Sequence, residues 1–294
     1  PNVGKPLVDD ERISGIAFTG STLTAKIIQN GLAAREGAIV PLIAETGGQN
    51  AMIVDSSALP EQVVADAVFS AFRSAGQRCS ALRVLFVQND IIDPLCEMLA
   101  GATQELRVGD PGLLCSDVGP VIDEDARTML EAHARRMDQE AHKLCEASLS
   151  TECANGTYFA PRAYRIDRLN QLEHEVFGPV IHVIGFDADK LDDVIDDINA
   201  SGYGLTLGIH SRVDETIEHV RKRARIGNLY VNRNMIGAVV GVQPFGGEGL
   251  SGTGPKAGGP RYLHRFACER SYSVNTTASG GNAALMSLQE DEII

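Results

Sequence analysis

Cys79 is the residue most suited to nucleophilic chemistry, because polar groups surround it in the sequence. It lies in the segment 72–83, between a helical pattern and an apolar strand pattern. Gly76 permits a tight turn there, so two packed elements would hold the cysteine while its sulfur faces a cleft. The cationic side chains Arg78 and Arg83 would favour the reactive thiolate. The alternative is an inert buried cysteine that acts as a small hydrophobe.

Glu45 is a candidate general base. It follows a buried strand pattern at 39–44 and precedes Gly47 and Gly48. A carboxylate at the carboxyl end of a strand, next to glycines, lies where open α/β sheets place ligands. Beside an apolar cleft, the pKa of such a glutamate should rise towards the range useful for a base. The alternative is a glutamate that accepts hydrogen bonds from the turn it begins.

A strand pattern at 13–18 leads through a glycine turn into a helix, an arrangement that can bind phosphate. Ser21 or Thr22 is the expected N-cap. The free N–H groups of the first helical turn and the helix dipole would point at the turn. An ordinary capped helix is the alternative. The helix should bury one apolar face, which carries Leu23, Ile27 and Ile28.

Composition narrows the classes of function. The 294 residues are 44% hydrophobic and carry a formal net charge of −13, which argues against nucleic acid or an anionic membrane surface as partner. No apolar run approaches the length of a membrane span. The six cysteines include no C-x-x-C pair, so neither a zinc knuckle nor a dithiol motif is indicated. We expect no metal site and a reducing, cytoplasmic location.

The order of the patterns predicts an α/β fold, since strands alternate with helices and such alternation implies a mostly parallel sheet. A helix is expected at 60–72, and Asp90 should cap the next one. A long polar helix is expected at 123–147, with His133 and His142 on its surface. Pro161 places the following strand at an edge or a bulge.

Two further segments have a distinct composition. The acidic run at 187–197 alternates with apolar residues, which indicates the solvated face of an amphipathic helix and not a calcium loop. Nine glycines between residues 237 and 259 predict a long irregular loop, and such loops within compact domains are usually functional.

Five motifs in order along the chain resemble the aldehyde dehydrogenase superfamily. They are F-T-G-S-T at 18–22, A-E-T-G-G at 44–48, G-Q-R-C-S-A at 76–81, E-V-F-G-P at 175–179 and P-F-G-G at 244–247. The fuller variants at 45–50, 76–80, 234–245 and 247–260 resemble the branch that oxidises L-glutamate γ-semialdehyde (Δ1-pyrroline-5-carboxylate), as found in bacterial bifunctional proline-catabolism flavoproteins.

The resemblance implies an NAD-dependent oxidation of L-glutamate γ-semialdehyde to L-glutamate. Cys79 would attack the aldehyde to give a thiohemiacetal, with its own backbone N–H as one oxyanion donor. Loss of hydride to NAD would leave a thioester, and Glu45 would act as general base on the water that hydrolyses it.

The resemblance also implies which residues bind the two small molecules. The expected cofactor-binding residues are Gly20, Ser21, Thr46, Gly47, Glu175 and Phe177. The expected substrate-binding residues are Ser80, Gly237, Ala238 and Phe245.

The resemblance implies an aldehyde dehydrogenase-like fold, with a partial Rossmann-type cofactor domain and a parallel-sheet catalytic domain. Residues 1–47 would be the C-terminal part of the NAD-binding domain, 48–266 the catalytic domain, and 267–294 an oligomerisation strand and tail. A homo-oligomer would form through residues 270–277. An upstream proline dehydrogenase part is expected in a longer polypeptide, with activity impaired in this portion alone.

Two other classes of function remain open from the residues themselves. Cys79 could serve a hydrolase or acyltransferase with His174 or His182 as its base, in which case Glu45 has no role. Alternatively, the chain could have a structural role without catalysis, in which case Cys79 would be unreactive towards alkylating agents at neutral pH.

Overall fold

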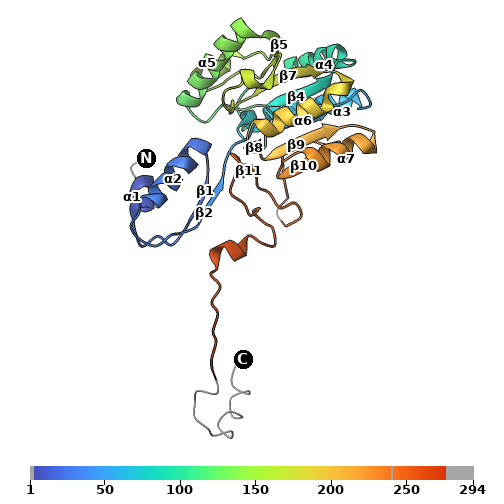
Figure 1. Cartoon of the computed structure of the whole chain (residues 1–294). Helices are drawn as coiled ribbons and strands as arrows, with labels where there is room; N and C mark the ends of the chain where they lie inside the picture. The colour runs from blue at the N-terminus through green and yellow to red at the C-terminus, as the bar shows by residue number, and fades with distance from the viewer. Residues whose placement is uncertain (1–2, 240, 276–294) are drawn as a thin grey trace.

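The computed structural model describes residues 3–239 and 241–275. These residues form two main sheets, a small parallel one and a larger, mostly parallel one (Figure 1). The smaller sheet pairs β1 (Ile16–Thr19) with β2 (Leu42–Glu45), and the helices α1 (Gly4–Asp9) and α2 (Thr22–Ala33) contact each other in the same lobe. The predicted α/β class is confirmed.

The larger sheet has seven strands in the order β10-β9-β3-β4-β7-β6-β5. All neighbours are parallel except β5 and β6, which confirms the mostly parallel sheet. The bounds are β3 Ala51–Val54, β4 Val84–Gln88, β5 His142–Glu146, β6 Arg162–Arg165, β7 Val180–Phe186, β9 Thr206–His210 and β10 Asn228–Val231.

Helices cover both faces of this sheet (Figure 1). The chain moves one way along the sheet from β3 to β4 and then to β7, and the other way from β7 to β9 and β10. Helices α3 (Pro60–Phe72) and α4 (Ile92–Gln104) contact each other and lie on one face. Helices α6 (Leu191–Ala200) and α7 (Asp214–Arg223) lie on the opposite face, because parallel crossovers are right-handed and the chain there moves the other way. Helix α5 (Glu124–Glu140) contacts His182 of β7, whereas α4 lies against Gly185 of the same strand, so α5 lies on the face opposite α4.

The core lies between the large sheet and its helices. Strands β3 and β4 are buried along their whole length, which explains why their sequences are apolar runs without alternation. On α3, Val64 and Phe72 are buried and Val68, which lies between them at i+4 spacing, is half-buried. On α6, the apolar residues face the core and the aspartates face solvent, which confirms the amphipathic reading of the acidic run. None of the described helices is long and apolar enough to span a membrane.

Several local predictions were wrong at helix and strand ends. Helix α4 begins without a side-chain cap, so Asp90 does not cap it; the Asp90 carboxylate instead accepts a hydrogen bond from Gln88. The helix expected at 123–147 ends at Glu140, and the remainder forms β5. Pro161 directly precedes β6, which is an interior strand; since proline lacks only an N–H, the position before the strand tolerates it.

His133 is half-buried, contrary to the prediction, whereas His142 is exposed as expected. The His133 ring contacts the His182 ring, with 2.9 Å between their Nε2 atoms. An amphipathic reading of α5 alone places His133 on the polar face, but the helix packs onto the face of the sheet at β6 and β7.

In the small lobe, Ser21 caps α2 as predicted, since its hydroxyl accepts a hydrogen bond from the Thr24 N–H. The expected buried face of α2 is only partly present. Ile28 is buried, whereas Leu23 and Ile27 are 72% and 62% exposed.

The glycine-rich segment is ordered by contacts with strands, which is why it is not a free loop. Its short strand β11 (Glu248–Gly249) pairs antiparallel with β8 (Tyr203–Gly204). The Thr253 N–H donates to the Ala44 carbonyl of β2. Beyond it, residues 267–275 are exposed and run away from the body of the molecule (Figure 1); the rest of the expected oligomerisation segment, from residue 276, lies outside the described residues.

Candidate active site

The candidate site lies where the ends of the two sheets meet. Glu45 is the last residue of β2, and only residues 46–50 separate it from the start of β3. The carboxyl ends of the small sheet therefore approach the amino ends of the large one. Residues 76–81, which we call the nucleophile turn, precede β4, so Cys79 also lies at the amino ends of the large sheet's strands. For the large sheet this departs from the usual position of ligands, outside the carboxyl ends of the strands.

A single cavity of about 1450 Å³ opens at this junction, with residues of both lobes in its walls. That volume accommodates a dinucleotide together with a small substrate. All twelve residues predicted from the sequence line it: Gly20, Ser21, Glu45, Thr46, Gly47, Cys79, Ser80, Glu175, Phe177, Gly237, Ala238 and Phe245.

The turn that carries Cys79 requires glycine at one position. A 3₁₀ segment, Arg73–Gly76, connects α3 to the turn, and three consecutive residues in it have positive φ. At Gly76, φ is +65° and a Cβ atom would collide with the Gly178 carbonyl. The predicted role of Gly76 is confirmed, and Cys79 itself is half-buried.

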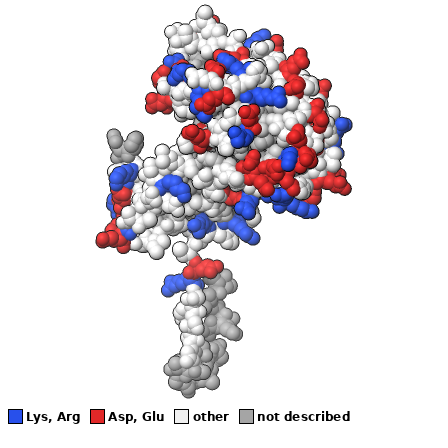
Figure 2. Space-filling view, turned by 45° about the horizontal axis from the view of Figure 1, so that its top comes forward, with Lys and Arg blue, Asp and Glu red and all other residues white. Residues whose placement is uncertain are grey.

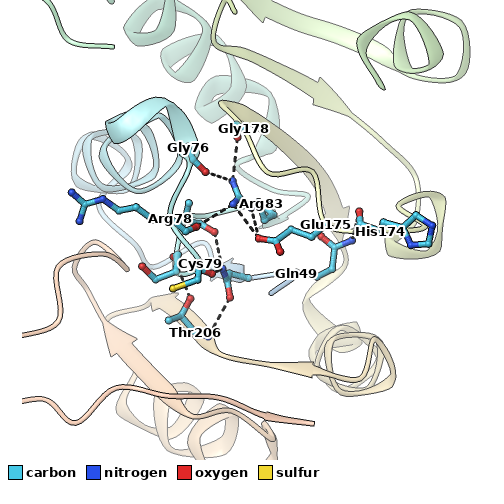
Figure 3. A network of polar contacts seen from close by, with 12 residues as sticks. Gln49, Gly76, Arg78, Cys79, Arg83, His174, Glu175, Gly178 and Thr206 are labelled. Atoms are coloured by element: carbon cyan, nitrogen blue, oxygen red, sulfur yellow. Dashed lines mark hydrogen bonds and ion pairs between the residues drawn. The ribbon is translucent and has the colours of Figure 1, made fainter. Parts of the chain in front are cut away.

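Arg83 organises the interior side of this turn (Figure 3). Its fully buried guanidinium donates to the Gly76 carbonyl at 2.7 Å and to the Gly178 and Arg78 carbonyls at 3.1 Å. It also forms an ion pair with Glu175, with 3.1 Å between Nη2 and Oε1. The ion pair and carbonyl contacts compensate the desolvation of the guanidinium. Arg83 therefore links the nucleophile turn to the E-V-F-G-P motif.

The prediction that nearby cations favour the thiolate was wrong. Burial raises the pKa of Cys79, and the negative charges of Glu175 and Glu45 add to that shift. The backbone N–H groups of Ser80 and Cys79 oppose it. The physical reason is that the Arg83 charge is paired with Glu175 and bound by backbone carbonyls, so its attraction for the thiolate does not outweigh burial and the carboxylate charges.

Glu45 has the electrostatics expected of a base. Burial raises its pKa to about 7, while a hydrogen bond from Gly247 and the charge of Lys256 limit the rise. Its Oε2 atom accepts from the Gly247 N–H at 3.2 Å. Its buried Oε1 atom has no hydrogen-bond partner among the described residues. A carboxyl group with this pKa can take up a proton near neutral pH.

The residues expected at the cofactor surround the other part of the cavity. Ser21 and Gly20 lie at the start of α2, where helical N–H groups lack intrahelical partners. Gly47 packs against the Glu175 carboxylate so closely that a side chain would displace it. Burial raises the pKa of Glu175, and the ion pair with Arg83 opposes the rise. The Arg83 guanidinium carbon also lies 5.1 Å from the Phe177 ring centre.

On the substrate side, the glycine-rich segment forms one wall of the cavity. Gly237 has a φ of +81°, and Phe245 is held by reciprocal backbone hydrogen bonds with Ala257 at 3.0 and 2.8 Å. Ser80 is buried on the opposite side, next to Cys79. The described residues contain no group of three His, Cys, Asp or Glu side chains that could hold a metal ion.

Neither histidine considered as a partner of Cys79 is placed for that role. His182 is fully buried, with its Nε2 near His133 and its Nδ1 near the Arg83 carbonyl. Burial lowers its pKa to about 3. His174 lines the cavity, but Figure 3 shows its ring pointing away from Cys79.

Sequence reasoning missed three buried polar residues that hold the site together. Arg83 was treated only as a charge near the thiol, and Asn50 and Thr206 were not singled out. Asn50 closes the E-T-G-G-Q-N motif, and both Asn50 and Arg83 directly precede fully apolar strands. A polar residue immediately before a buried strand is the signal that could have identified these two.

The aldehyde dehydrogenase family matches residues 1–271 of this sequence. The chain belongs to the aldehyde dehydrogenase family. Among curated proteins of this family, it is 54% identical over 280 residues to the bifunctional protein PutA of Escherichia coli, covering 92% of this chain and 21% of PutA. It is 35% identical over 266 residues to the 1-pyrroline-5-carboxylate dehydrogenase of Geobacillus kaustophilus, covering 89% of this chain and 51% of that enzyme.

Solved structures of aldehyde dehydrogenase family members share the fold. Proline utilization A from Bradyrhizobium japonicum superposes with a TM-score of 0.91 at 54% identity, covering 95% of this chain and 28% of that chain. The 1-pyrroline-5-carboxylate dehydrogenase from Thermus with bound NAD has a TM-score of 0.83 at 33% identity, covering 90% and 51%. The sequence thus spans about a fifth of the curated PutA relative and about half of the dehydrogenase relative.

Proposed function

We propose that this chain carries the catalytic residues for NAD-dependent oxidation of L-glutamate γ-semialdehyde to L-glutamate. The observation that supports this proposal most is that one cavity brings together Cys79, Glu45 and the residues of the cofactor motifs. The relatives named as proline utilization A and 1-pyrroline-5-carboxylate dehydrogenase support the choice of substrate.

NAD is the proposed cofactor, and the cavity fits it in two respects. The first N–H groups of α2 and the Ser21 cap suit a pyrophosphate at a helix N-terminus. The absence of a side chain at Gly47 leaves its backbone open beside Glu175, whose carboxylate would accept hydrogen bonds from ribose hydroxyls. Phe177 would pack nearby. NAD, when bound, supplies the hydride acceptor that converts a thiohemiacetal into a thioester.

The residues of the chain would perform the remaining chemistry. Cys79 adds to the aldehyde carbon, and the backbone N–H groups of the turn stabilise the oxyanion. Glu45 then takes a proton from the water that attacks the thioester, which releases the carboxylate product. The pKa of about 7 leaves a large fraction of Glu45 ionised at neutral pH.

The substrate residues remain part of the proposal. The backbone N–H groups of Gly237 and Ala238 would bind the distal carboxylate of the substrate, and Phe245 would contact its aliphatic part. Ser80 would add a hydroxyl close to the reacting carbon.

NADH formation from glutamate semialdehyde, followed by absorbance, tests the proposal. Full-length Escherichia coli PutA serves as positive control, and Cys79→Ala as negative control. NADH formation that disappears in Cys79→Ala would support the proposal. NADH formation that survives this substitution would remove Cys79 from the mechanism. Ester hydrolysis alone does not separate a dehydrogenase from a hydrolase or acyltransferase, since Cys79 can react with an ester in either, whereas an unreactive Cys79 would favour a structural role.

A further inference from the structure

The carbonyl groups of the nucleophile turn are bound from the interior of the protein. Side chains that precede or begin strands bind five of them, in residues 76–81. Asn50 Nδ2 donates to the Cys79 carbonyl at 2.6 Å and to the Ala81 carbonyl at 2.8 Å. Thr206 Oγ1 donates to the Ser80 carbonyl at 3.3 Å. Arg83 binds the carbonyls of Gly76 and Arg78.

Asn50 and Thr206 form one buried unit, which we name the turn clamp. Asn50 is 2% exposed and Thr206 is fully buried. The Asn50 Oδ1 atom accepts from the Thr206 N–H at 3.2 Å, so every polar atom of the Asn50 amide is used. The Asn50 backbone carbonyl also accepts from the N–H groups of Arg83 and Val84. The clamp thereby joins the starts of β3, β4 and β9.

This arrangement fixes the direction of the N–H groups of the turn. A peptide unit is planar, so its N–H points opposite to its C=O. Each carbonyl shares its peptide unit with the N–H of the next residue. The Cys79 carbonyl, held by Asn50, therefore fixes the direction of the Ser80 N–H, and the Arg78 carbonyl, held by Arg83, fixes that of the Cys79 N–H. The Ser80 carbonyl, held by Thr206, fixes the Ala81 N–H, which donates to the Arg78 carbonyl inside the turn. Within the described residues, no oxygen accepts the N–H groups of Cys79 or Ser80. These two groups are the ones that stabilise negative charge on the Cys79 sulfur. Successive free N–H groups in a turn form an anion-binding concavity.

We infer that Asn50 is a positioning residue, which together with the Arg83 contact holds the nucleophile turn so that the Ser80 and Cys79 N–H groups face the thiolate and, later, the oxyanion. Its side chain does not contact the reacting atoms. Glu45 and Asn50 belong to the same six-residue motif, so one short segment supplies the base at its start and positions the nucleophile at its end. The role in oxyanion stabilisation rests on the proposed function, whereas the role in thiol reactivity does not.

Alkylation of Cys79 by iodoacetamide in the 294-residue chain tests the inference without cofactor or aldehyde. The second-order rate is measured between pH 6 and 10, and mass spectrometry of the Cys79 peptide separates it from the exposed Cys115 and Cys268. The charged groups that act on the thiol are Glu175, Glu45 and Arg83; none of these is changed.

Asn50→Leu removes the contact with the Cys79 carbonyl and nearly keeps the side-chain volume. We expect it to move the midpoint of the alkylation profile upward by about 0.5–1 pH unit, with a rate at pH 7 about three- to tenfold lower. Asn50→Ala makes the same test with a smaller side chain. Thr206→Val is the matched control, because it removes a contact with a carbonyl of the same turn whose peptide N–H, that of Ala81, does not face the cavity; it should keep the wild-type profile.

Circular dichroism and thermal unfolding show which variants fold. A folded Asn50→Leu or Asn50→Ala with the wild-type alkylation profile would overturn the inference, even if its Tm is lower, since a purely structural role changes stability and not the profile. A shift of the same size in the control Thr206→Val would also overturn it. Failure of the NADH assay would not affect this result, because alkylation requires neither NAD nor the aldehyde.

Discussion

At the scale of single residues, the site contains two acidic groups whose pKa values differ from their ordinary ones because they are buried. Burial raises the pKa of Cys79 and raises that of Glu45 to about 7. A raised thiol pKa keeps the sulfur largely protonated at neutral pH. A base with a pKa near 7 can take a proton from water and return it under the same conditions.

Glu45→Gln should remove the step that depends on the base. In the wild-type protein, thioester hydrolysis should rise with pH through about 7, as Glu45 loses its proton. In the variant, this step should fall by about 10²–10⁴-fold and lose that inflection. The measurement is p-nitrophenyl ester hydrolysis against pH, with the initial burst reporting acylation of Cys79. An unchanged inflection near pH 7 would assign the base to another residue.

The same substitution should affect stability in a pH-dependent way. The pKa of Glu45 is raised in the folded state, so the folded protein binds the proton more tightly than the unfolded chain. Stability from this group is therefore present at low pH and lost as pH rises from about 4.5 to about 7. Glu45→Gln should be more stable than wild type at pH 8, by about 1 kcal/mol after a discount for partial exposure. Urea unfolding at pH 5 and pH 8 measures the difference.

Glu175→Gln should make Cys79 more reactive. Burial is the main cause of the raised thiol pKa, and the Glu175 charge is the next. Removing the charge should lower the pKa of Cys79 and speed its alkylation at pH 8 severalfold. Glutamine keeps a carbonyl oxygen that can accept from Arg83. Glu173→Gln, an exposed change two residues away, is the control and should leave the rate unaltered. A slower or equal rate in Glu175→Gln would contradict this electrostatic assignment.

At the scale of elements, the connection from α3 to β4 depends on backbone conformations that most residues disfavour. Ser74, Ala75 and Gly76 all have positive φ. Close approach of Gly76 to Gly178 joins this connection to the segment that precedes β7. The turn thus contacts parts of the chain that are a hundred residues apart.

Gly76→Ala should destabilise the protein by about 3 kcal/mol or more, because it adds both a steric collision and an unfavourable φ. Gly101→Ala is the matched control. Gly101 lies inside α4, and a Cβ there meets nothing within 4 Å. The control should be stabilised by about 0.5–1 kcal/mol. Denaturant unfolding measures both, and similar effects of the two substitutions would contradict the role assigned to the Gly76 turn.

At the scale of the whole molecule, the cavity depends on the contact between two lobes. The Thr253 N–H donates a hydrogen bond to the Ala44 carbonyl of the small sheet, and β11 pairs with β8 beside the large sheet. Acidic and basic side chains are interspersed on the face seen in Figure 2. With a net charge of −13, such a surface does not favour polyanionic partners.

Deletion of residues 267–294 should abolish self-association, if these residues pair subunits as the family resemblance implies. Residues 267–274 are exposed and make no strand within the described structure, and an exposed extended segment can pair with another chain. Size-exclusion chromatography with light scattering should show an oligomer for the whole chain and a monomer after deletion. A deletion variant that remains oligomeric would place the interface elsewhere.

The sequence by itself determined the α/β class, most strand and helix positions, and twelve of the residues that line the cavity. Apolar runs, glycine turns and short motifs carry that information locally, so Cys79, Glu45 and Gly76 could be recognised without coordinates. The limits of α5 and the burial of His133 could not be recognised in this way, since they depend on where the helix packs onto the sheet.

Tertiary structure alone decided the electrostatics of the nucleophile. Arg83 is four residues from Cys79 in the sequence, yet its charge is paired with Glu175, ninety-two residues away. Asn50 precedes β3 and Thr206 begins β9, far apart in the chain. They meet only because the amino ends of these two strands lie side by side in the folded sheet. A pKa depends on desolvation and on the charges that surround a group in three dimensions. Spacing along the chain does not reveal which residue forms an ion pair with a given charged side chain.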